Sequence, residues 1–307
     1  MDKMKIFPGS ASVQLTEDIC EHLTMPMGKA CITRFPDGEI NVKLLDDVRG
    51  SDVFIVQSTC PPVNENIMEL LILIDCVRRA SADRISAVIP YYGYARQDRK
   101  AEGRVPITAK LVANMIVAAG ADRVLTIDLH SSQIQGFFDI PLDHLYAAPV
   151  MGKYYLELDI PNLVVVCSDV GGLKMANAYA KLLKAGFAVV EKVRVDPWTT
   201  RAGNIIGNVK GQNILIIDDM ITAGGSIAEA CKVLKDQGAL DIYVGATHGV
   251  LCQGSVERLS PAPIKEIAVT DTIPLGDAGR KLKVKVLTVS RLLSETMRRI
   301  HFNESVS

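Results

Sequence analysis

Residues 216–226 read Ile-Ile-Asp-Asp-Met-Ile-Thr-Ala-Gly-Gly-Ser, and this stretch carries the clearest signal in the sequence. A short apolar strand ends in two adjacent carboxylates, and a turn of small residues then opens a helix over 226–237. We expect Ser226 and Glu229 to form a capping box at the start of that helix and Gly238 to end it. Ligands of doubly wound sheets bind beyond the carboxyl ends of the strands, so this turn is expected to carry chemistry.

The rest of the chain alternates short β-branched runs with helical patterns. Strands are expected at 52–57, 85–89, 123–129, 163–167, 188–195, 214–217 and 242–246, and helices at 66–80, 107–119, 173–185 and 226–237. Apolar strands that alternate with helices indicate an α/β protein with mainly parallel sheets flanked by helices. Two segments also match, Gly120–His130 and Gly238–His248, each with a glycine before a strand that runs to a histidine. We therefore expect two similar domains.

Length and composition bound the possibilities. The 307 residues suffice for two ordinary domains, which we place at 1–145 and 146–284, with the segment from about 285 to 307 as a candidate to pack back on the first. A net charge of -1 disfavours a nucleic-acid partner. The apolar runs are of strand length, the first residues form no apolar signal core, and the scattered cysteines lack zinc-ligand spacing. A cytoplasmic location without membrane contact is the default expectation.

The turn after the two carboxylates suits a sugar phosphate. Glycines let backbone amides converge on an anion, and the start of a helix adds a partial positive charge. Carboxylates accept hydrogen bonds from vicinal hydroxyls, as Asp218 and Asp219 can do beside such a phosphate nest. The alternative is an ordinary capped helix behind two solvated aspartates. The pair follows four apolar residues directly, which favours the functional interpretation.

This stretch resembles the phosphoribosyl diphosphate loop of the type I phosphoribosyltransferase fold. The resemblance implies that Asp218 and Asp219 grip the ribose hydroxyls. It also implies that the 5-phosphate is bound by the turn residues Thr222, Ala223, Gly224, Gly225 and Ser226. The common pattern has a second acidic residue and a threonine where Thr222 and Ala223 stand, so the division of phosphate contacts among side chains stays open.

Three further segments, 34–39, 90–99 and 128–138, are not general to that fold. They resemble those of ribose-phosphate diphosphokinases, and the resemblance extends from Phe7 to Val250. Arginine forks suit polyphosphate and aromatic rings can cover a purine face, although such a loop alone could simply be solvated. The resemblance implies an ATP site formed by Phe35, Asp37, Gly38, Glu39, Arg96, Gln97, Asp98 and Arg99. It further implies that the first loop reaches the ATP of a neighbouring subunit in a homo-oligomer, a hexamer.

Two residues after strands are candidates for the metal site. His130 follows a strand that ends in Asp128, and Asp169 follows the strand over 163–167. A lone histidine is more often structural than catalytic. The resemblance implies that His130 and Asp169 both face Mg²⁺ carried by the ATP phosphates. Magnesium prefers oxygen ligands and keeps waters, so a sparse protein contribution is expected.

Lys192 and Arg194 are the candidate catalytic pair. In an extended segment they lie on the same side, which is also what a solvated edge would show. The resemblance implies that they lie on a loop that closes over the reacting phosphates, with Arg194 also near the ribose 5-phosphate. The residues after Arg194 match the family poorly, so the resemblance does not predict how that loop closes.

The resemblance therefore implies a direct displacement in which the C1 hydroxyl of ribose 5-phosphate attacks the β-phosphorus of Mg-ATP and AMP leaves. Two alternatives stay open. A phosphoribosyltransferase shares the Asp-Asp turn but does not need segments 34–39 and 91–99. A non-catalytic regulatory subunit of the same fold would be expected to lose the loop lysine or the metal residues, whereas this chain keeps them.

Overall fold

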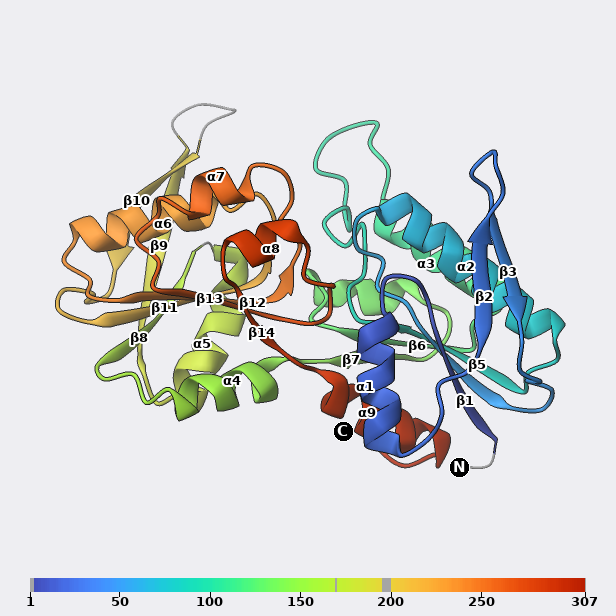
Figure 1. The fold of residues 1–307 in the computed structure, drawn as a ribbon. Helices are drawn as coiled ribbons and strands as arrows, with labels where there is room; N and C mark the ends of the chain where they lie inside the picture. The colour runs from blue at the N-terminus through green and yellow to red at the C-terminus, as the bar shows by residue number, and fades with distance from the viewer. Residues whose placement is uncertain (1–2, 169, 195–199, 307) are drawn as a thin grey trace. The chain divides into compact units, whose positions relative to one another are not determined.

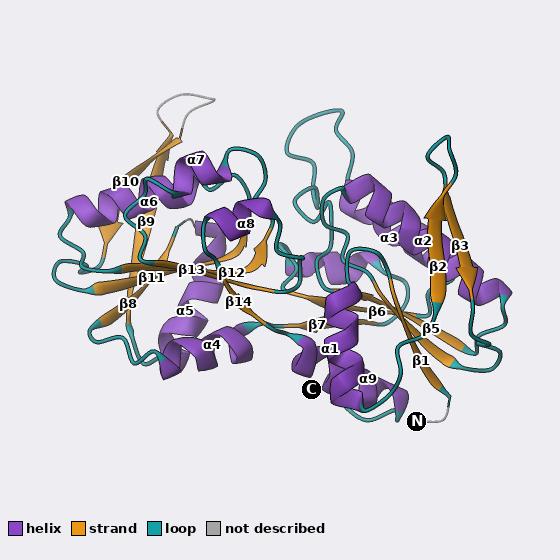
Figure 2. Ribbon diagram, in the orientation of Figure 1, coloured by secondary structure: helices purple, strands orange, loops and turns teal. Residues whose placement is uncertain are grey.

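The computed structural model describes residues 3–168, 170–194 and 200–306, and the chain divides into two compact units (Figure 1). Unit 1 comprises Met1–Tyr146, Thr272–Pro274 and Thr288–Ser307, and unit 2 comprises Ala147–Asp271 and Leu275–Leu287. Each unit has its own mainly parallel sheet with flanking helices, which confirms the predicted fold class (Figure 2). Within the described ranges, every helix is too short or too polar to span a bilayer.

Unit 1 has a sheet of five parallel strands in the order β1-β4-β5-β6-β7. The strands are β1 Met4–Pro8, β4 Asp52–Val56, β5 Arg84–Ile89, β6 Arg123–Ile127 and β7 Leu142–Leu145. Helices α2 (Val63–Arg79) and α3 (Thr108–Ala119) share one core with alternate residues of β5, namely Ile85, Ala87 and Ile89. Successive side chains of a strand point to opposite faces, so Ser86 and Val88, both fully buried, face the other side.

Two helices from opposite ends of the chain pack together in unit 1. They are α1 (Val13–Leu23) and α9 (Ser290–His301), blue and dark red in Figure 1. The end of α9 is tied to the sheet by Asp52, whose carboxylate lies 2.7 Å from Nδ1 of His301. Arg84 donates to both oxygens of Asp52 and to the carbonyl of Ile300 at 2.9 Å. This segment is therefore an integral part of unit 1.

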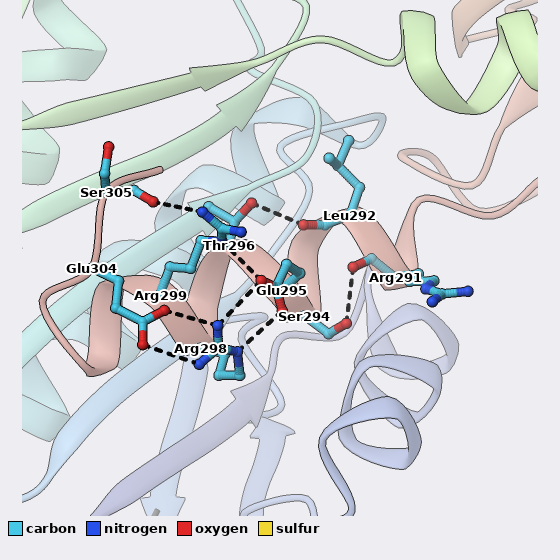
Figure 3. A network of polar contacts seen from close by, with 9 residues as sticks. All are labelled: Arg291, Leu292, Ser294, Glu295, Thr296, Arg298, Arg299, Glu304 and Ser305. Carbon is cyan, nitrogen blue, oxygen red and sulfur yellow. Dashed lines mark hydrogen bonds and ion pairs between the residues drawn. The ribbon is translucent and has the colours of Figure 1, made fainter. Parts of the chain in front are cut away.

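The solvent side of α9 carries a network of ion pairs (Figure 3). Arg298 and Arg299 both pair with Glu295, and Arg298 also pairs with Glu304. Hydrogen bonds from Arg298 and then Arg299 lower the pKa of the Glu295 carboxyl to about 2. Because these groups lie at the surface, water screens the pairs and their contribution to stability is small.

A two-stranded hairpin projects from unit 1. Strands β2 (Ala30–Arg34) and β3 (Ile40–Leu44) pair in antiparallel fashion, with Arg34 opposite Ile40. The turn between them occupies residues 35–39, and Gly38 adopts φ +97°, a conformation that glycine adopts without penalty. A short 3₁₀ helix, Ser132–Phe137, follows β6.

Unit 2 has a sheet of seven strands in the order β10-β9-β8-β11-β12-β13-β14. They are β8 Leu163–Cys167, β9 Gly186–Arg194, β10 Thr200–Ile206, β11 Asn213–Ile221, β12 Ile242–Gly249, β13 Glu266–Thr270 and β14 Lys285–Leu287, and of these neighbouring pairs only β9 and β10 are antiparallel. The helices are α4 Ala148–Glu157, α5 Leu173–Leu182, α6 Gly225–Asp236, α7 Ser255–Leu259 and α8 Asp277–Lys281, with a 3₁₀ turn at Val170–Gly172. The core packs α6 against alternate residues of β11 and β12.

The sheets of the two units have the same arrangement of four consecutive strands. The run β4-β5-β6-β7 of unit 1 corresponds to β8-β11-β12-β13 of unit 2, and the matching segments of the sequence lie on β6 and β12. The fifth position differs, because β1 lies beside β4 whereas β9 lies beside β8. The loops β5–α3 and β11–α6 therefore occupy equivalent places in the two units.

Candidate functional site

The two adjacent carboxylates lie inside β11, near its end. Pairing of β11 with β8 stops at Ile217, but pairing with β12 continues from Asp218 to Ile221. The prediction of a strand that ends at 217 was therefore wrong, because β12 supplies backbone partners beyond that point. Asp218 and Asp219 lie just beyond the last described pair of β11 with β8.

The carboxylate of Asp218 is held in place by two donors. The hydroxyl of Ser168 donates to Oδ2 at 3.0 Å, and the backbone N–H of Asp219 donates to Oδ1 at 2.9 Å. Ionised carboxylate oxygens accept hydrogen bonds, as the hydroxyls of a sugar would donate them. Asp218 and Asp219 are half-buried. This geometry suits recognition of a vicinal diol.

The turn after β11 presents backbone amides. Gly224 is the N-cap of α6 with φ +73° and no side-chain capping bond, so the predicted capping box of Ser226 and Glu229 was wrong. A Cβ on Gly224 would lie 2.6 Å from Leu259 Cγ. The first helical bond runs from Ala228 N–H to the Gly224 carbonyl at 2.9 Å. The amides of 225–227 precede that bond, which leaves them available to an anion.

A second site lies in unit 1 beyond the carboxyl ends of β4 and β5. An open pocket of about 550 Å³ is lined by the loop after β5 and the first turn of α2: Val63, Asn64, Tyr91, Tyr94, Ala95, Arg96 and Gln97. Arg96 and Gln97 are exposed, whereas Tyr91 is buried. Aromatic rings beside a guanidinium suit the flat base and the charged phosphates of a nucleotide.

Side chains, rather than a turn of small residues, hold this pocket loop. The buried hydroxyl of Thr59 donates to the Tyr91 carbonyl at 2.8 Å and accepts from the Gly93 N–H at 2.6 Å. Tyr92 donates its hydroxyl to the Ala109 carbonyl at 2.9 Å, and burial raises the pKa of this phenol. Tyr94 adopts φ +64°. Such backbone strain is tolerated where the surroundings fix it and is common at ligand sites.

Two hydrogen bonds hold side chains in place at the rim of the pocket. The Tyr94 hydroxyl donates to Oδ1 of Asn64 at 2.5 Å. Thr108 donates its hydroxyl to Oε1 of Gln97 at 2.5 Å, which leaves the amide NH₂ of Gln97 as its donor end. Asp98 and Arg99 follow directly along the chain but do not line this pocket.

The predicted ATP-binding residues of the first segment form one tight turn. Phe35 N–H donates to the Glu39 carbonyl and Gly38 N–H to the Phe35 carbonyl, both at 2.9 Å. The side chain of Phe35 is 50% exposed, and Asp37, Gly38 and Glu39 are exposed too. None of these residues lines the 550 Å³ pocket of the same chain. An ion pair of 2.5 Å between Arg34 and Glu65 joins the hairpin to the first turn of α2.

The predicted metal residues are only partly described. His130 is exposed after β6, and the preceding Asp128 is buried with φ +40°. The backbone N–H of Leu129 donates to Nε2 of His144 at 2.9 Å, which fixes this loop to β7. Asp169 lies outside the described residues. Among those that are described, His, Cys, Asp and Glu form no group of three or more that could hold a metal ion.

The predicted catalytic pair lies on β9. The backbones of Lys192 and Arg194 pair with Ala202 and Thr200 of β10. The side chains of this pair lie outside what the structure describes. So do residues 195–199, where the loop closure was expected.

Some site residues were not predicted. Val63 and Asn64 line the pocket of unit 1, and Ser168 holds Asp218. A signal for Asn64 was available, because it lies in the first turn of the helix that follows β4, and ligands of such sheets bind beyond the carboxyl ends of the strands. The contact of Ser168 depends on β8 and β11 being neighbours, which no local pattern reveals.

Comparisons with known proteins agree along the whole chain. Residues 4–120 match the family model described as the N-terminal domain of ribose phosphate pyrophosphokinase, and residues 193–307 match the phosphoribosyl synthetase-associated domain. A ribose-phosphate pyrophosphokinase of Rhodopirellula baltica is 52% identical over 100% of this chain and 98% of its own. A ribose-phosphate pyrophosphokinase of Caldanaerobacter subterraneus is 48% identical over 100% of this chain and 97% of its own. The crystal structure of phosphoribosylpyrophosphate synthetase from Mycobacterium smegmatis, 39% identical, superposes with a TM-score of 0.91 over 98% of this chain and 99% of that one.

Proposed function

The chain belongs to the ribose-phosphate pyrophosphokinase family, and we propose which of its residues bind each substrate and which act on the transferred group. The enzyme transfers the β,γ-diphosphoryl group of ATP to the C1 hydroxyl of ribose 5-phosphate. The products are 5-phosphoribosyl 1-diphosphate and AMP. The bond from the C1 oxygen to the β-phosphorus forms, and the bond from that phosphorus to the α,β-bridging oxygen breaks.

Ribose 5-phosphate binds at the end of β11 in this proposal. Asp218 and Asp219 accept hydrogen bonds from the ribose 2- and 3-hydroxyls, and the amides of residues 222–226 bind the 5-phosphate. The single observation that carries the assignment is the juxtaposition of an anchored Asp218 carboxylate with a glycine-capped helix start. Held at both ends, the sugar keeps its C1 hydroxyl in a fixed position for attack.

ATP binds in the pocket of unit 1 in this proposal. Tyr91 and Tyr94 supply apolar surface for the base, Gln97 a directed amide, and Arg96 a permanent charge for the phosphates. Asp98 and Arg99 extend this polar rim toward the polyphosphate. His130 and Asp169 are the residues proposed to contact Mg²⁺, and a sparse protein contribution fits an ion that keeps waters and phosphate ligands. Bound Mg²⁺ would supply charge neutralisation on the phosphate oxygens.

Lys192 and Arg194 are proposed to act on the transferred group. Diphosphoryl transfer needs alignment and charge neutralisation more than covalent help from the protein. The two cations stabilise negative charge that develops on the leaving and transferred oxygens. We assign no general base.

The test is substitution of Lys192 by alanine, with AMP formation from ATP and ribose 5-phosphate as the readout. Turnover should fall by about 100-fold or more, while nucleotide affinity changes much less, because the lysine acts mainly on charge that forms in the transition state. Lys232→Ala, on the exposed side of α6, is the matched control and should keep turnover. If Lys192→Ala turns over at nearly the wild-type rate, the assignment is wrong.

The hairpin turn is proposed to complete the ATP site of a neighbouring subunit in a homo-oligomer, a hexamer, in the cytoplasm. The support is that Phe35 and Glu39 are exposed on a hydrogen-bonded turn and do not line the pocket of their own chain. Phe35→Ala and Arg96→Ala should each be nearly inactive alone. Mixing the two variants by subunit exchange should restore part of the activity, because some sites then draw intact residues from both chains. No restoration in assemblies shown to be mixed would rule out shared sites.

A further inference from the structure

We propose that Arg258, on α7, is a positioning residue that orients the peptide unit between Ala223 and Gly224 and so sets the enzyme's preference for a phosphorylated pentose. The inference rests on the proposed binding of ribose 5-phosphate at this turn.

The first observation is a set of three hydrogen bonds, here called tethers, that hold the carbonyls of the turn. Leu251 N–H donates to the Ile221 carbonyl at 2.9 Å and Cys252 N–H to the Thr222 carbonyl at 3.2 Å. Nη1 of Arg258 donates to the Ala223 carbonyl at 3.2 Å.

These tethers determine where the amides of the turn point. A trans peptide unit is planar, with its N–H directed opposite to its C=O. Because the carbonyls of 221–223 are all engaged by segment 251–258, the amides of 222–224 are directed away from that segment. Successive amides that converge in this way form an anion-binding nest, to which the start of α6 adds its partial positive charge.

The third tether differs from the first two because a side chain supplies it. The peptide unit that it holds ends in Gly224, whose φ of +73° belongs to a region that only glycine occupies at little cost. Glycine also permits the alternative orientation of the peptide unit, in which the carbonyl would face the phosphate. The hydrogen bond from Arg258 selects the orientation that donates.

The charge of Arg258 strengthens this effect. Among the described residues, no carboxylate forms an ion pair with Arg258, in contrast to Arg280, which pairs with Asp277. An ionised donor makes a stronger hydrogen bond than a neutral one and polarises the peptide unit, so the amide on its far side becomes a better donor. The side chain also lies next to Gly225, since a Cβ there would be 3.8 Å from Cδ of Arg258.

The experiment compares Arg258→Ala, Arg258→Met and Arg258→Lys with the wild type in the full-length enzyme. We expect the KM for ribose 5-phosphate to rise about tenfold in the alanine and methionine variants, with kcat and the KM for ATP within about twofold. Lysine keeps a charged donor and should recover part of the loss. Arg280→Ala is the matched control. That arginine also donates to a backbone carbonyl, that of Leu275 at 2.9 Å, but on a turn outside the site.

Unphosphorylated ribose separates positioning from general damage to the fold. Loss of Arg258 should lower kcat/KM about tenfold for ribose 5-phosphate and leave that for ribose within about twofold, because only the phosphate uses the nest. An equal loss for both sugars, or a KM for ribose 5-phosphate that stays within twofold of wild type, would overturn the inference. Should the alanine variant not fold, the lysine and methionine variants decide the same question. Wild-type enzyme that forms no AMP would instead overturn the proposed function.

Discussion

The loops after β5 and β11 occupy equivalent places in the two units but differ in length and in the groups that they present to a ligand. Residues 90–107 form a long loop that presents side chains, among them Tyr94, Arg96 and Gln97, around a pocket. Residues 222–224 form a short turn that presents backbone amides. A nucleotide base has a large flat face and few charges, whereas a phosphate is a small anion, so each loop suits a different ligand.

The supports of the two loops differ in the same way. Hydroxyl groups stabilise the long loop, two of them buried, those of Thr59 and Tyr92, and one at the exposed rim, that of Thr108. The short turn depends on its glycine and on donors from residues 251–258. Single substitutions should therefore weaken the long loop only partly, because several hydroxyls stabilise it. In the short turn, substitution of the glycine should impair binding strongly.

The largest effect is expected for Gly224→Ala. A side chain at φ +73° is strained, and its Cβ would lie 2.6 Å from Leu259, so unfolding free energy should fall by about 2–4 kcal/mol. The kcat/KM for ribose 5-phosphate should fall by about 100-fold, measured by AMP formation, since the amides lose their alignment. Gly225→Ala adds only an ordinary 3.8 Å contact, and its loss should be about tenfold smaller. Equal losses for the two variants would mean that the positive φ is unimportant.

An intermediate effect is expected for Thr59→Val in the long loop. The substitution keeps the shape but leaves the buried Gly93 N–H without its acceptor, which costs about 1–3 kcal/mol in thermal or denaturant unfolding. The KM for ATP should rise about tenfold while that for ribose 5-phosphate stays constant. Ser58→Ala is the control, because this buried hydroxyl donates to the Thr272 carbonyl and not to the loop. A KM for ATP that rises as much in the control would contradict the role given to Thr59.

The smallest effect is expected for Thr108→Val at the rim. Its bond to Oε1 of Gln97 is exposed, so the free energy of unfolding should change by less than about 0.5 kcal/mol. The KM for ATP should rise about two- to threefold, because the Gln97 amide is no longer held with its NH₂ outward. Thr108→Ser keeps the hydroxyl and should behave as wild type. A tenfold rise for valine would show that this amide is a central contact.

Local patterns predicted much of this arrangement. Runs such as Ile85 to Ile89 were recognisable as buried strands because their apolar residues are of strand length and bounded by turns. The rule that ligands bind at the carboxyl ends of parallel strands indicated, from the sequence, the regions around Arg96 and Asp218 as candidate sites. The structure places Arg96 on the pocket and Asp218 just beyond the last described pair of β11 with β8.

What the sequence did not predict depends on partners far along the chain. β11 extends to Ile221 because β12 continues beside it. The N-cap is Gly224 rather than Ser226, in a turn that segment 251–258 holds by its carbonyls. The hairpin of β2 and β3 was not predicted, although its residues alternate between half-buried and exposed positions, as those of a strand with one covered face do.

The return of α9 to unit 1 has a consequence for biosynthesis. Leu293 and Met297 of this helix are fully buried, and α9 packs on α1, which the ribosome makes first. Unit 1 therefore stays incomplete while the nascent chain is translated through unit 2, and it is completed only after Ser290–His301 emerges. Truncation before α9 should thus expose the apolar side of α1 and impair a unit whose first strand lies near the opposite end of the polypeptide.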